Sequence, residues 1–256
     1  MIDQRAVVSV KADVALGVEI GPFSIIGPDV QIAEGTRIGP HVVINGATSI
    51  GRDNRIFQFC SIGDEPQDKK YAGEATRLEI GDRNTIRECC TINRGTTQDR
   101  GVTTIGDDNW IMAYVHVAHD CVIGNNIVMA NATTLAGHVQ VDDWVILGGF
   151  TKVHQNCRIG AHSFTAMDCA LSRDLPPYVT AAGHLAVPKG VNTEGLKRRG
   201  FSAEQISRIR DAYKTLYRSD LRLAEAIEAL RKPASTHDEI KMLVDFLDTS
   251  ERSIIR

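Results

Sequence analysis

Four of the eight histidines of the chain lie between residues 105 and 160, and one of them is followed directly by an acid. These residues are His116, His119, Asp120, His138 and His154. A neutral imidazole can take a proton from an alcohol near neutral pH, and an adjacent carboxylate orients the ring. Three histidines could instead bind a transition metal. Either chemistry requires a fold that brings the side chains together.

The same stretch carries an aliphatic residue or Met at every sixth position, from Ile105 to Ile159. The six-residue period also runs from Val8 to Ile62 without a slip. A helix repeats at 3.6 residues and a strand at two, so the pattern predicts a coil of very short parallel strands. With three strands to a turn, residues 18 apart stack directly on neighbouring coils, about 4.7–4.9 Å from each other.

Within each six-residue unit, counted from the recurring aliphatic, the first and fifth positions point inward. The second and sixth point outward, and the third and fourth form a corner. This register stacks His119 on Gly137 and Asp120 on His138. The edge that results gathers His116, His119, Asp120, Gly137, His138, His154 and Gln155.

Three interpretations of this edge remain open. The first is general-base catalysis, with the backbone N–H of Gly137 directed at a developing oxyanion. The second is a metal site, although HVAH on an extended segment does not place two rings side by side as HExxH does on a helix. The third is a polar outer edge without chemistry. Ser-nucleophile, P-loop and dinucleotide-binding motifs are missing, which favours direct attack over a covalent intermediate.

Two insertions interrupt the repeat, at residues 64–79 and 93–104. Insertions in a solenoid form surface loops, often at a binding face, although the charges of the first loop would equally suit a solvated surface. From about residue 191 the periodicity becomes helical, with a predicted capping box at Ser202 and Gln205 and a helix end at Pro233. We expect a coil over 1–190 and a small domain of two or three helices over 191–256.

Composition narrows the function classes. The chain has 256 residues, 43% hydrophobic and only 5% aromatic, with 22 glycines and a net charge of −3. The charge is not that of a nucleic-acid-binding protein. The N-terminus shows no apolar signal segment and no apolar run is long enough to cross a bilayer, so we expect a cytoplasmic protein without membrane insertion. The six cysteines form no CxxC pair and are expected to be reduced.

Six motifs carry a family resemblance that covers essentially the whole chain: PQDKKYAGE (66–74), TINRGT (91–96), HVAHDC (116–121), TLAGHV (134–139), VHQNCRIGAH (153–162) and GVNTEGLKRRGF (190–201). With them the chain resembles the hexapeptide-repeat acyltransferases, and among these the branch of lipid A biosynthesis. The resemblance implies a left-handed parallel β-helix followed by a small α-helical domain. It also implies transfer of an (R)-3-hydroxyacyl chain from acyl carrier protein to the 3-hydroxyl of UDP-N-acetylglucosamine.

The resemblance implies a role for each matching residue. His119 would be the general base, Asp120 its partner, and the Gly137 amide the oxyanion donor. The sugar and the nucleotide phosphates would be bound by Asp68, Lys70, His116, His138, His154 and Gln155. The nucleotide would be bound by Asn192, Glu194, Arg198 and Arg199.

In the family, the depth of the acyl pocket depends on the side chain at the position of Met167. Met rather than Gly there implies a chain nearer ten carbons than fourteen.

The family also implies a homotrimer with active sites between subunits. Acyl carrier protein would dock on basic residues of the C-terminal region. No cofactor is expected, because the acyl chain is attached to the phosphopantetheine group of the carrier protein. Alternatives are a related N-acyltransferase, amide formation on a 3-amino UDP-sugar, and a γ-carbonic-anhydrase-like metalloprotein.

Overall fold

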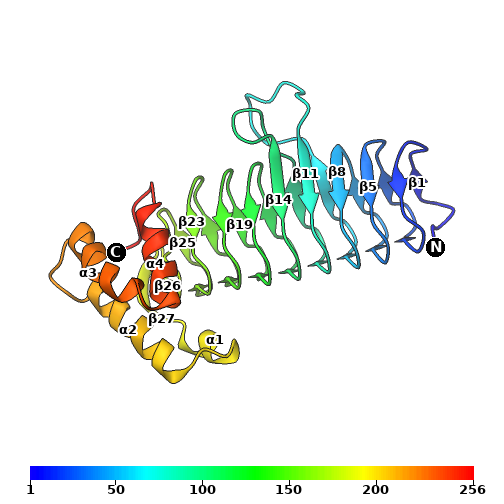
Figure 1. The fold of residues 1–256 in the computed structure, drawn as a ribbon. Helices are drawn as coiled ribbons and strands as arrows, with labels where there is room; N and C mark the ends of the chain where they lie inside the picture. Colours follow the sequence, from blue (N-terminus) through cyan, green and yellow to red (C-terminus); the bar gives the residue numbers. More distant parts are fainter.

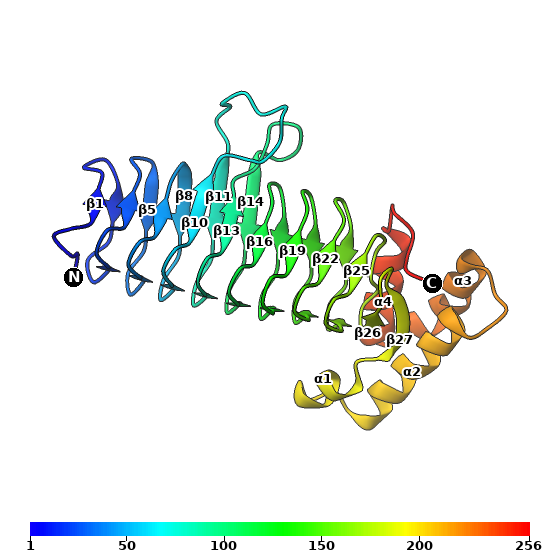
Figure 2. The same ribbon diagram turned by 180° about the vertical axis from the view of Figure 1, so that it is seen from behind.

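The chain winds into a long three-sided prism with a helical domain at its C-terminal end. The computed structural model describes residues 1–256, and the two termini lie at opposite ends of the prism (Figures 1 and 2). Three parallel sheets form the sides, with strands stacked coil upon coil. The fold is therefore the β-helix that the six-residue period predicts.

Each sheet takes every third strand of the coil. We call them sheets 1, 2 and 3 in chain order. Sheet 1 contains β1 (Val7–Val8), β4 (Ile25–Ile26), β7 (Val43–Ile44), β10 (Ser61–Asp64), β13 (Thr91–Asn93), β16 (His116–Val117), β19 (Thr134–Leu135), β22 (Lys152–Val153) and β25 (Ala170–Leu171). Sheet 2 contains β2 (Asp13–Val14), β5 (Val30–Ile32), β8 (Ala47–Ile50), β11 (Arg77–Ile80), β14 (Val102–Ile105), β17 (Val122–Ile123), β20 (Gln140–Val141) and β23 (Arg158–Ile159).

Sheet 3 ends differently from the other two. It contains β3 (Glu19–Ile20), β6 (Arg37–Ile38), β9 (Arg55–Ile56), β12 (Thr85–Ile86), β15 (Trp110–Ile111), β18 (Val128–Met129), β21 (Ile146–Leu147), β24 (Phe164–Thr165), β26 (Val179–Ala182) and β27 (Val187–Val191). The last two strands pair antiparallel. The sequence predicted only an irregular exit here, because a hairpin outside the six-residue phase leaves no periodic signal.

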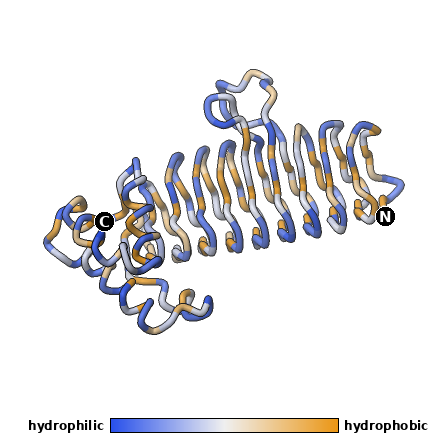
Figure 3. The backbone as a smooth tube through the Cα atoms, viewed as in Figure 1, coloured by the Kyte–Doolittle hydropathy of each residue, from blue (hydrophilic) through white to orange (hydrophobic).

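The aliphatic positions of the repeat form one continuous core. From Ile20 onwards the recurring residues are buried, Val117 and Leu135 completely, and so is Cys121 at the fifth position of its unit. His116 pairs with Thr134, which pairs with Lys152, so residues 18 apart do stack. Along the tube in Figure 3, apolar segments recur on coil after coil and alternate with polar ones. All six cysteines are free.

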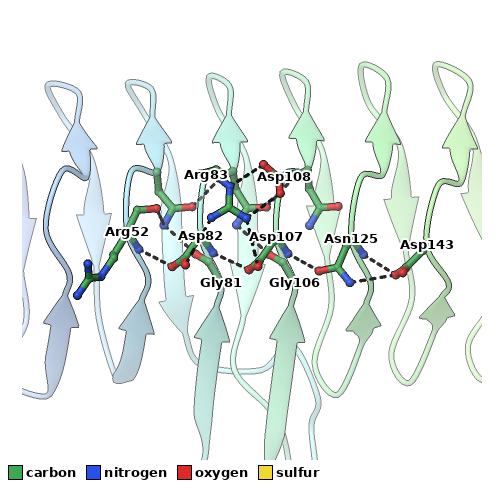
Figure 4. A network of polar contacts seen from close by, with 12 residues as sticks. Arg52, Gly81, Asp82, Arg83, Gly106, Asp107, Asp108, Asn125 and Asp143 are labelled. Carbon is green, nitrogen blue, oxygen red and sulfur yellow. Dashed lines mark hydrogen bonds and ion pairs between the residues drawn. The ribbon is translucent and has the colours of Figure 1, made fainter. Parts of the chain in front are cut away.

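A polar ladder ties successive coils together at the corner between sheets 2 and 3 (Figure 4). Asp143 accepts a hydrogen bond of 2.8 Å from the backbone N–H of Asn125. The side chain of Asn125 accepts from the N–H of Asp107 at 2.7 Å, and Asp107 accepts from that of Asp82 at 2.8 Å. Each side chain therefore satisfies a backbone donor of the preceding coil, which sharpens the register that the core already favours.

Both insertions leave the prism at the same corner, between sheets 1 and 2, and lie side by side (Figures 1 and 2). They are shorter than the sequence predicted, since β11 begins at Arg77 and β14 at Val102. These strands pair over four residues, from Arg77 with Val102 to Ile80 with Ile105. Residues outside the six-residue phase are therefore recruited into sheet 2 by hydrogen bonding.

The C-terminal region forms four helices: α1 (Thr193–Arg198), α2 (Ala203–Tyr217), α3 (Leu223–Ala234) and α4 (Asp238–Asp248). The sequence predicted two or three, and the short α1 was missed. The capping box of Ser202 and Gln205 is present at the start of α2. Pro233 lies inside the last turn of α3, which ends one residue later. None of the helices combines the length and apolar character needed to cross a bilayer.

Candidate active site

His119 and Asp120 form a hydrogen-bonded pair at the corner between sheets 1 and 2. They follow β16, and Nδ1 of His119 lies 2.8 Å from Oδ2 of Asp120. The carboxylate is fully buried, whereas 15% of the His119 side chain is exposed. Because a carboxylate only accepts, Nδ1 carries the proton and Nε2 is left with a free lone pair. That nitrogen can take a proton from a substrate.

Asp120 is held by the second insertion. It accepts hydrogen bonds from the backbone N–H of Thr96, at 2.9 and 3.1 Å, and from the Thr96 hydroxyl at 2.6 Å. Its own N–H donates to Oγ1 of Thr103 at 2.8 Å. Burial disfavours the charged form, but the hydrogen bonds from His119 and Thr96 outweigh it and lower the pKa of Asp120. The carboxylate therefore stays ionised beside the histidine.

Thr96 and Thr103 were not among the residues predicted for the site. The sequence carried a weak signal, because the insertion ends just before the coil that contains His119. Periodicity cannot place side chains that lie outside the repeat.

Gly137 lies directly against the His119 ring. A Cβ atom at this position would be 2.6 Å from Cε1 and 2.7 Å from Nε2 of His119, closer than real contacts allow. Only glycine therefore permits the ring to rest on the backbone. The N–H of Gly137 has no acceptor within the chain, so it is available to a ligand beside Nε2 of the histidine.

His138 completes the cluster. Its ring stands edge-on to that of His119, with centroids 5.0 Å apart and planes at 89°. Its Nδ1 lies 3.9 Å from Oδ2 of Asp120 and 2.8 Å from Oδ2 of Asp99. Asp120 and His138 both adopt left-handed backbone angles, with φ of 59° and 62°, which gives consecutive coils the same turn. Asp99 was not predicted as a site residue.

The two remaining histidines flank this cluster without joining it. His116 on β16 bonds through Nδ1 to Oγ1 of Thr91 at 2.7 Å. Burial, with a smaller effect from His119, lowers the pKa of His116 and favours the neutral ring. His154 is exposed after β22, and its Nδ1 lies 3.1 Å from the carbonyl oxygen of Gln155.

The cluster has the composition of a small metal site. One ligand atom each from His119, Asp120 and His138 lies within 4.8 Å of the others. In this structure, however, Nδ1 of His119 and Oδ2 of Asp120 are hydrogen-bonded to each other at 2.8 Å. A cation bound through this nitrogen would replace its proton, so that arrangement and the hydrogen-bonded pair exclude each other.

Asp68 and Lys70 lie on the first insertion, away from the histidines. Oδ1 of Asp68 accepts from the backbone N–H of Lys70 at 3.0 Å. No hydrogen bond or ion pair joins either side chain to the histidine cluster. The insertions contact each other instead, through a 2.8 Å bond from Arg94 to the hydroxyl of Tyr71.

The four predicted nucleotide-binding residues line one cleft of about 620 Å³ on the outer face of sheet 3. They are Asn192, Glu194, Arg198 and Arg199. The guanidinium of Arg199 lies 5.5 Å from the ring centroid of Trp144, an aromatic wall that the sequence did not single out. Asn192 caps α1, accepting from Gly195 N–H and donating to the carbonyl of His162. Glu194 is paired with Lys197 at 2.9 Å.

This cleft and the histidine cluster lie on different sides of the prism. The cleft walls include Ile146 on β21 and Phe164 on β24 of sheet 3, whereas His119 lies at the corner between sheets 1 and 2. Met167 follows β24 at the third corner, between sheets 3 and 1, with 74% of its surface exposed. One chain therefore does not bring all predicted site residues together.

A parallel β-helix of six-residue repeats with a histidine–carboxylate pair on its edge defines a hexapeptide-repeat transferase. Residues 17–46 and 103–137 match the bacterial transferase hexapeptide (six repeats) family, and residues 174–255 match domain 2 of Udp N-acetylglucosamine O-acyltransferase. The acyl-(acyl-carrier-protein)–UDP-N-acetylglucosamine O-acyltransferase of Herminiimonas arsenicoxydans is 60% identical over 260 residues, spanning 100% of this chain and 99% of the relative. That of Thiobacillus denitrificans is 57% identical over 255 residues, with the same coverage.

A solved structure gives the same result. The UDP-N-acetylglucosamine acyltransferase of Francisella novicida superposes with a TM-score of 0.99 at 45% identity, covering 100% of this chain and 94% of that one. The chain belongs to the UDP-N-acetylglucosamine O-acyltransferase family.

Proposed function

We propose that this protein transfers an (R)-3-hydroxyacyl chain from acyl carrier protein to the 3-hydroxyl of UDP-N-acetylglucosamine, the first step of lipid A biosynthesis. Family membership supports the reaction class. The observation that carries the mechanism is the His119–Asp120 pair resting on Gly137, with Nδ1 of His119 2.8 Å from the carboxylate. The base His119, oriented by Asp120, and the free N–H of Gly137 therefore lie close enough together to act on the same substrate.

In the first step Nε2 of His119 removes the proton of the sugar 3-hydroxyl as the oxygen attacks the thioester carbonyl carbon. A base placed in this way typically contributes about 10²–10⁴-fold to the rate. Asp120 holds the ring and stabilises the imidazolium that forms. Its lowered pKa suits this role, because the carboxylate remains charged throughout.

In the second step the tetrahedral intermediate collapses. The Gly137 N–H, unpaired within the chain, donates to the oxyanion while it exists. The C–S bond then breaks, and the imidazolium returns its proton to the departing pantetheine sulfur. The products are the 3-O-acylated sugar nucleotide and the free thiol of the carrier, so the protein ends the cycle unchanged.

The remaining predicted residues would bind the substrates around this centre. His138 lies closest, beside His119, and we assign it to the sugar. The other residues assigned to the sugar and phosphates are His116, His154, Gln155, Asp68 and Lys70. We assign the uridine portion to the cleft on sheet 3, where Arg198 and Arg199 supply positive charge.

We infer a homotrimer whose sites lie between subunits, because a neighbouring copy could bring its sheet 3 cleft to the histidines of the first. The corner between sheets 3 and 1 also exposes a row of large apolar side chains, unusual for a free surface. They are Phe23, Phe59, Tyr114, Phe150 and Met167. Acyl carrier protein would dock on basic residues of the helical domain.

Met167 belongs to this apolar row, where an acyl chain could lie between subunits. We propose that its side chain blocks the far end of the acyl pocket and selects a chain near ten carbons. Met167→Gly should then shift the preferred donor towards fourteen carbons. A native enzyme that prefers the fourteen-carbon donor, with no shift in the variant, would refute the assignment.

The test of the activity is an acyl-transfer assay with UDP-N-acetylglucosamine and 3-hydroxyacyl carrier proteins of several lengths. Native protein should transfer the chain to the 3-hydroxyl, and His119→Ala should lose about 10²–10⁴-fold in kcat while remaining folded. No transfer by native protein would refute the function. Metal analysis of the active protein separates the alternatives, since stoichiometric zinc would favour the metalloprotein instead.

A further inference from the structure

A second histidine–carboxylate pair lies beside the first. Nδ1 of His138 lies 2.8 Å from Oδ2 of Asp99, a residue 39 positions earlier on the second insertion. The pair is partly open to solvent, with 25% of the His138 side chain and 37% of the Asp99 side chain exposed. Asp99 lies outside the six-residue repeat and has no role in the reaction described above.

The loop that carries Asp99 is the one that fastens Asp120. The backbone N–H groups of Asp99 and Gly101 both donate to the carbonyl of Thr96, at 3.3 and 3.0 Å. Thr96 in turn bonds Asp120 through its N–H and its hydroxyl. One tight turn, from Thr96 to Asp99, thus bonds one site residue at each end. Thr96 fixes the carboxylate of Asp120, and Asp99, three residues later, bonds His138.

The contact selects one tautomer of His138. A carboxylate accepts but does not donate, so Nδ1 of His138 carries a hydrogen and Nε2 of the neutral ring keeps a lone pair. The contact also determines where that hydrogen points. Nδ1 is 3.9 Å from Oδ2 of Asp120, the oxygen that His119 uses at 2.8 Å. Without Asp99, the His138 ring could rotate so that its Nδ1–H points at Asp120 and competes with His119 for that carboxylate.

We propose that Asp99 is a positioning residue for acyl transfer. It holds His138 as the Nδ1–H tautomer, with Nε2 free to accept a hydrogen bond from a hydroxyl of the acceptor sugar. It also leaves His119 as the only histidine that bonds Asp120. The effect on kinetics rests on the proposed function. The tautomer of His138 does not, because it can be measured in the protein without substrate.

The kinetic test is a double-mutant cycle between Asp99 and His138. Asp99→Asn keeps the size of the side chain but can donate as well as accept, so it no longer selects the tautomer. We expect its KM for UDP-N-acetylglucosamine to rise up to about tenfold, the upper range for the loss of one hydrogen bond between neutral groups, with partial recovery in Asp99→Glu. In a His138→Ala background, Asp99→Asn should have no further effect. Gln98→Ala, exposed on the same loop, is the control and should match native protein.

The structural test uses long-range ¹H–¹⁵N correlation of the histidine rings, with the His138 signals assigned from His138→Ala. Native protein should show His138 protonated at Nδ1, and Asp99→Asn should show a mixture or the other tautomer. The proposal is overturned if Asp99→Asn keeps native KM and the native tautomer, or if its effect persists fully without His138. If native protein proves inactive, the proposed function fails while the ring spectra still decide whether Asp99 selects the tautomer.

Discussion

At the scale of single residues, the candidate active site depends on close contacts rather than on unusual residue types. His119 is one of eight histidines. It is set apart by a buried carboxylate at 2.8 Å and by a glycine whose missing side chain leaves room for the ring. Each contact joins residues adjacent in the chain or one coil apart. Small changes at these positions should therefore affect activity far more than folding.

Gly137→Ala is the sharpest test of this arrangement. The added Cβ would lie 2.6 Å from Cε1 of His119, so the ring must move away from the attacking hydroxyl. We expect kcat to fall about 10²-fold or more, the lower range for loss of a positioned base. Thermal unfolding should shift by only a few degrees, because the ring has solvent to move into. Native kcat in the alanine variant would contradict the contact.

His162 predicts a pH effect on stability. Its ring is buried between Trp144 and Tyr178, close to Arg199. Burial, then the charge of Arg199, lowers the pKa of His162 from 6.5 to about 4. Below about pH 6.5 the unfolded chain therefore takes up a proton at this residue that the folded protein refuses until about pH 4.

The stabilising contribution of neutral His162 is thus present above pH 6.5 and is lost as the pH falls towards 4. It amounts to about 3 kcal/mol over this interval. His162→Phe keeps an aromatic ring in the stack without a titrating group. Urea unfolding at a series of pH values should show native protein losing more stability on acidification than the variant. Parallel curves would contradict the assignment.

At the scale of elements, the prism and its insertions have different tasks. The strands supply a rigid ladder in which each corner repeats the last, reinforced by chains of side-chain acceptors such as Asp107 and Asn125 (Figure 4). The second insertion supplies what the repeat cannot. It reaches over the corner and bonds Asp120 through Thr96 and His138 through Asp99. Removing its contacts should weaken the site while leaving the coil intact.

Thr96→Val tests the loop as a clamp. The variant keeps the backbone N–H but loses the hydroxyl that donates to Asp120 at 2.6 Å. Loss of a hydrogen bond to a charged group costs about 1.5–3 kcal/mol, and the pKa of Asp120 should rise because this bond helps to lower it. We expect lower stability in urea and reduced kcat. Thr97→Val, at the exposed neighbouring position, should leave both unchanged; equal losses in the two variants would reject the clamp.

At the scale of the whole molecule, one chain separates the two parts of the proposed site. The histidine cluster lies at the corner between sheets 1 and 2, and the basic cleft lies on sheet 3. One hydrophobic core runs continuously through the prism, so the chain cannot bend to bring the cleft onto the histidines without breaking that core. The proposed homotrimer would bring the two parts together, because each copy would offer its histidine cluster to one neighbour and its cleft to the other.

Subunit mixing tests this arrangement directly. His119→Ala and Arg199→Ala should each be nearly inactive alone, since every site lacks either the base or the cleft arginine. Refolded or co-expressed together, they should form hybrid trimers in which roughly a quarter of the sites contain both intact residues. We expect activity to return to that fraction. Mixtures as inactive as the single variants would place both residues in one subunit's site.

The six-residue period was sufficient to predict the coil, the stacking of residues 18 apart and the edge that joins His119, Gly137 and His138. These features repeat along the chain, and a local repeat of inward and outward positions specifies them without any long-range information. The capping box at Ser202 was likewise visible, because it involves residues three apart. The resemblance added the substrates, which no spacing could suggest.

Other features depend on contacts that carry no period. Thr96 and Asp99 reach the site from a loop whose path is set by its own turn, and the cleft of Trp144 and Arg199 needs the helical domain to pack beside sheet 3. No periodic pattern in the sequence predicted the hairpin of β26 and β27 or the short helix α1. Repetition in the chain therefore determined the scaffold and its histidine edge, whereas tertiary packing of non-repeating segments decided which loop groups bond Asp120 and His138 and where the basic cleft forms.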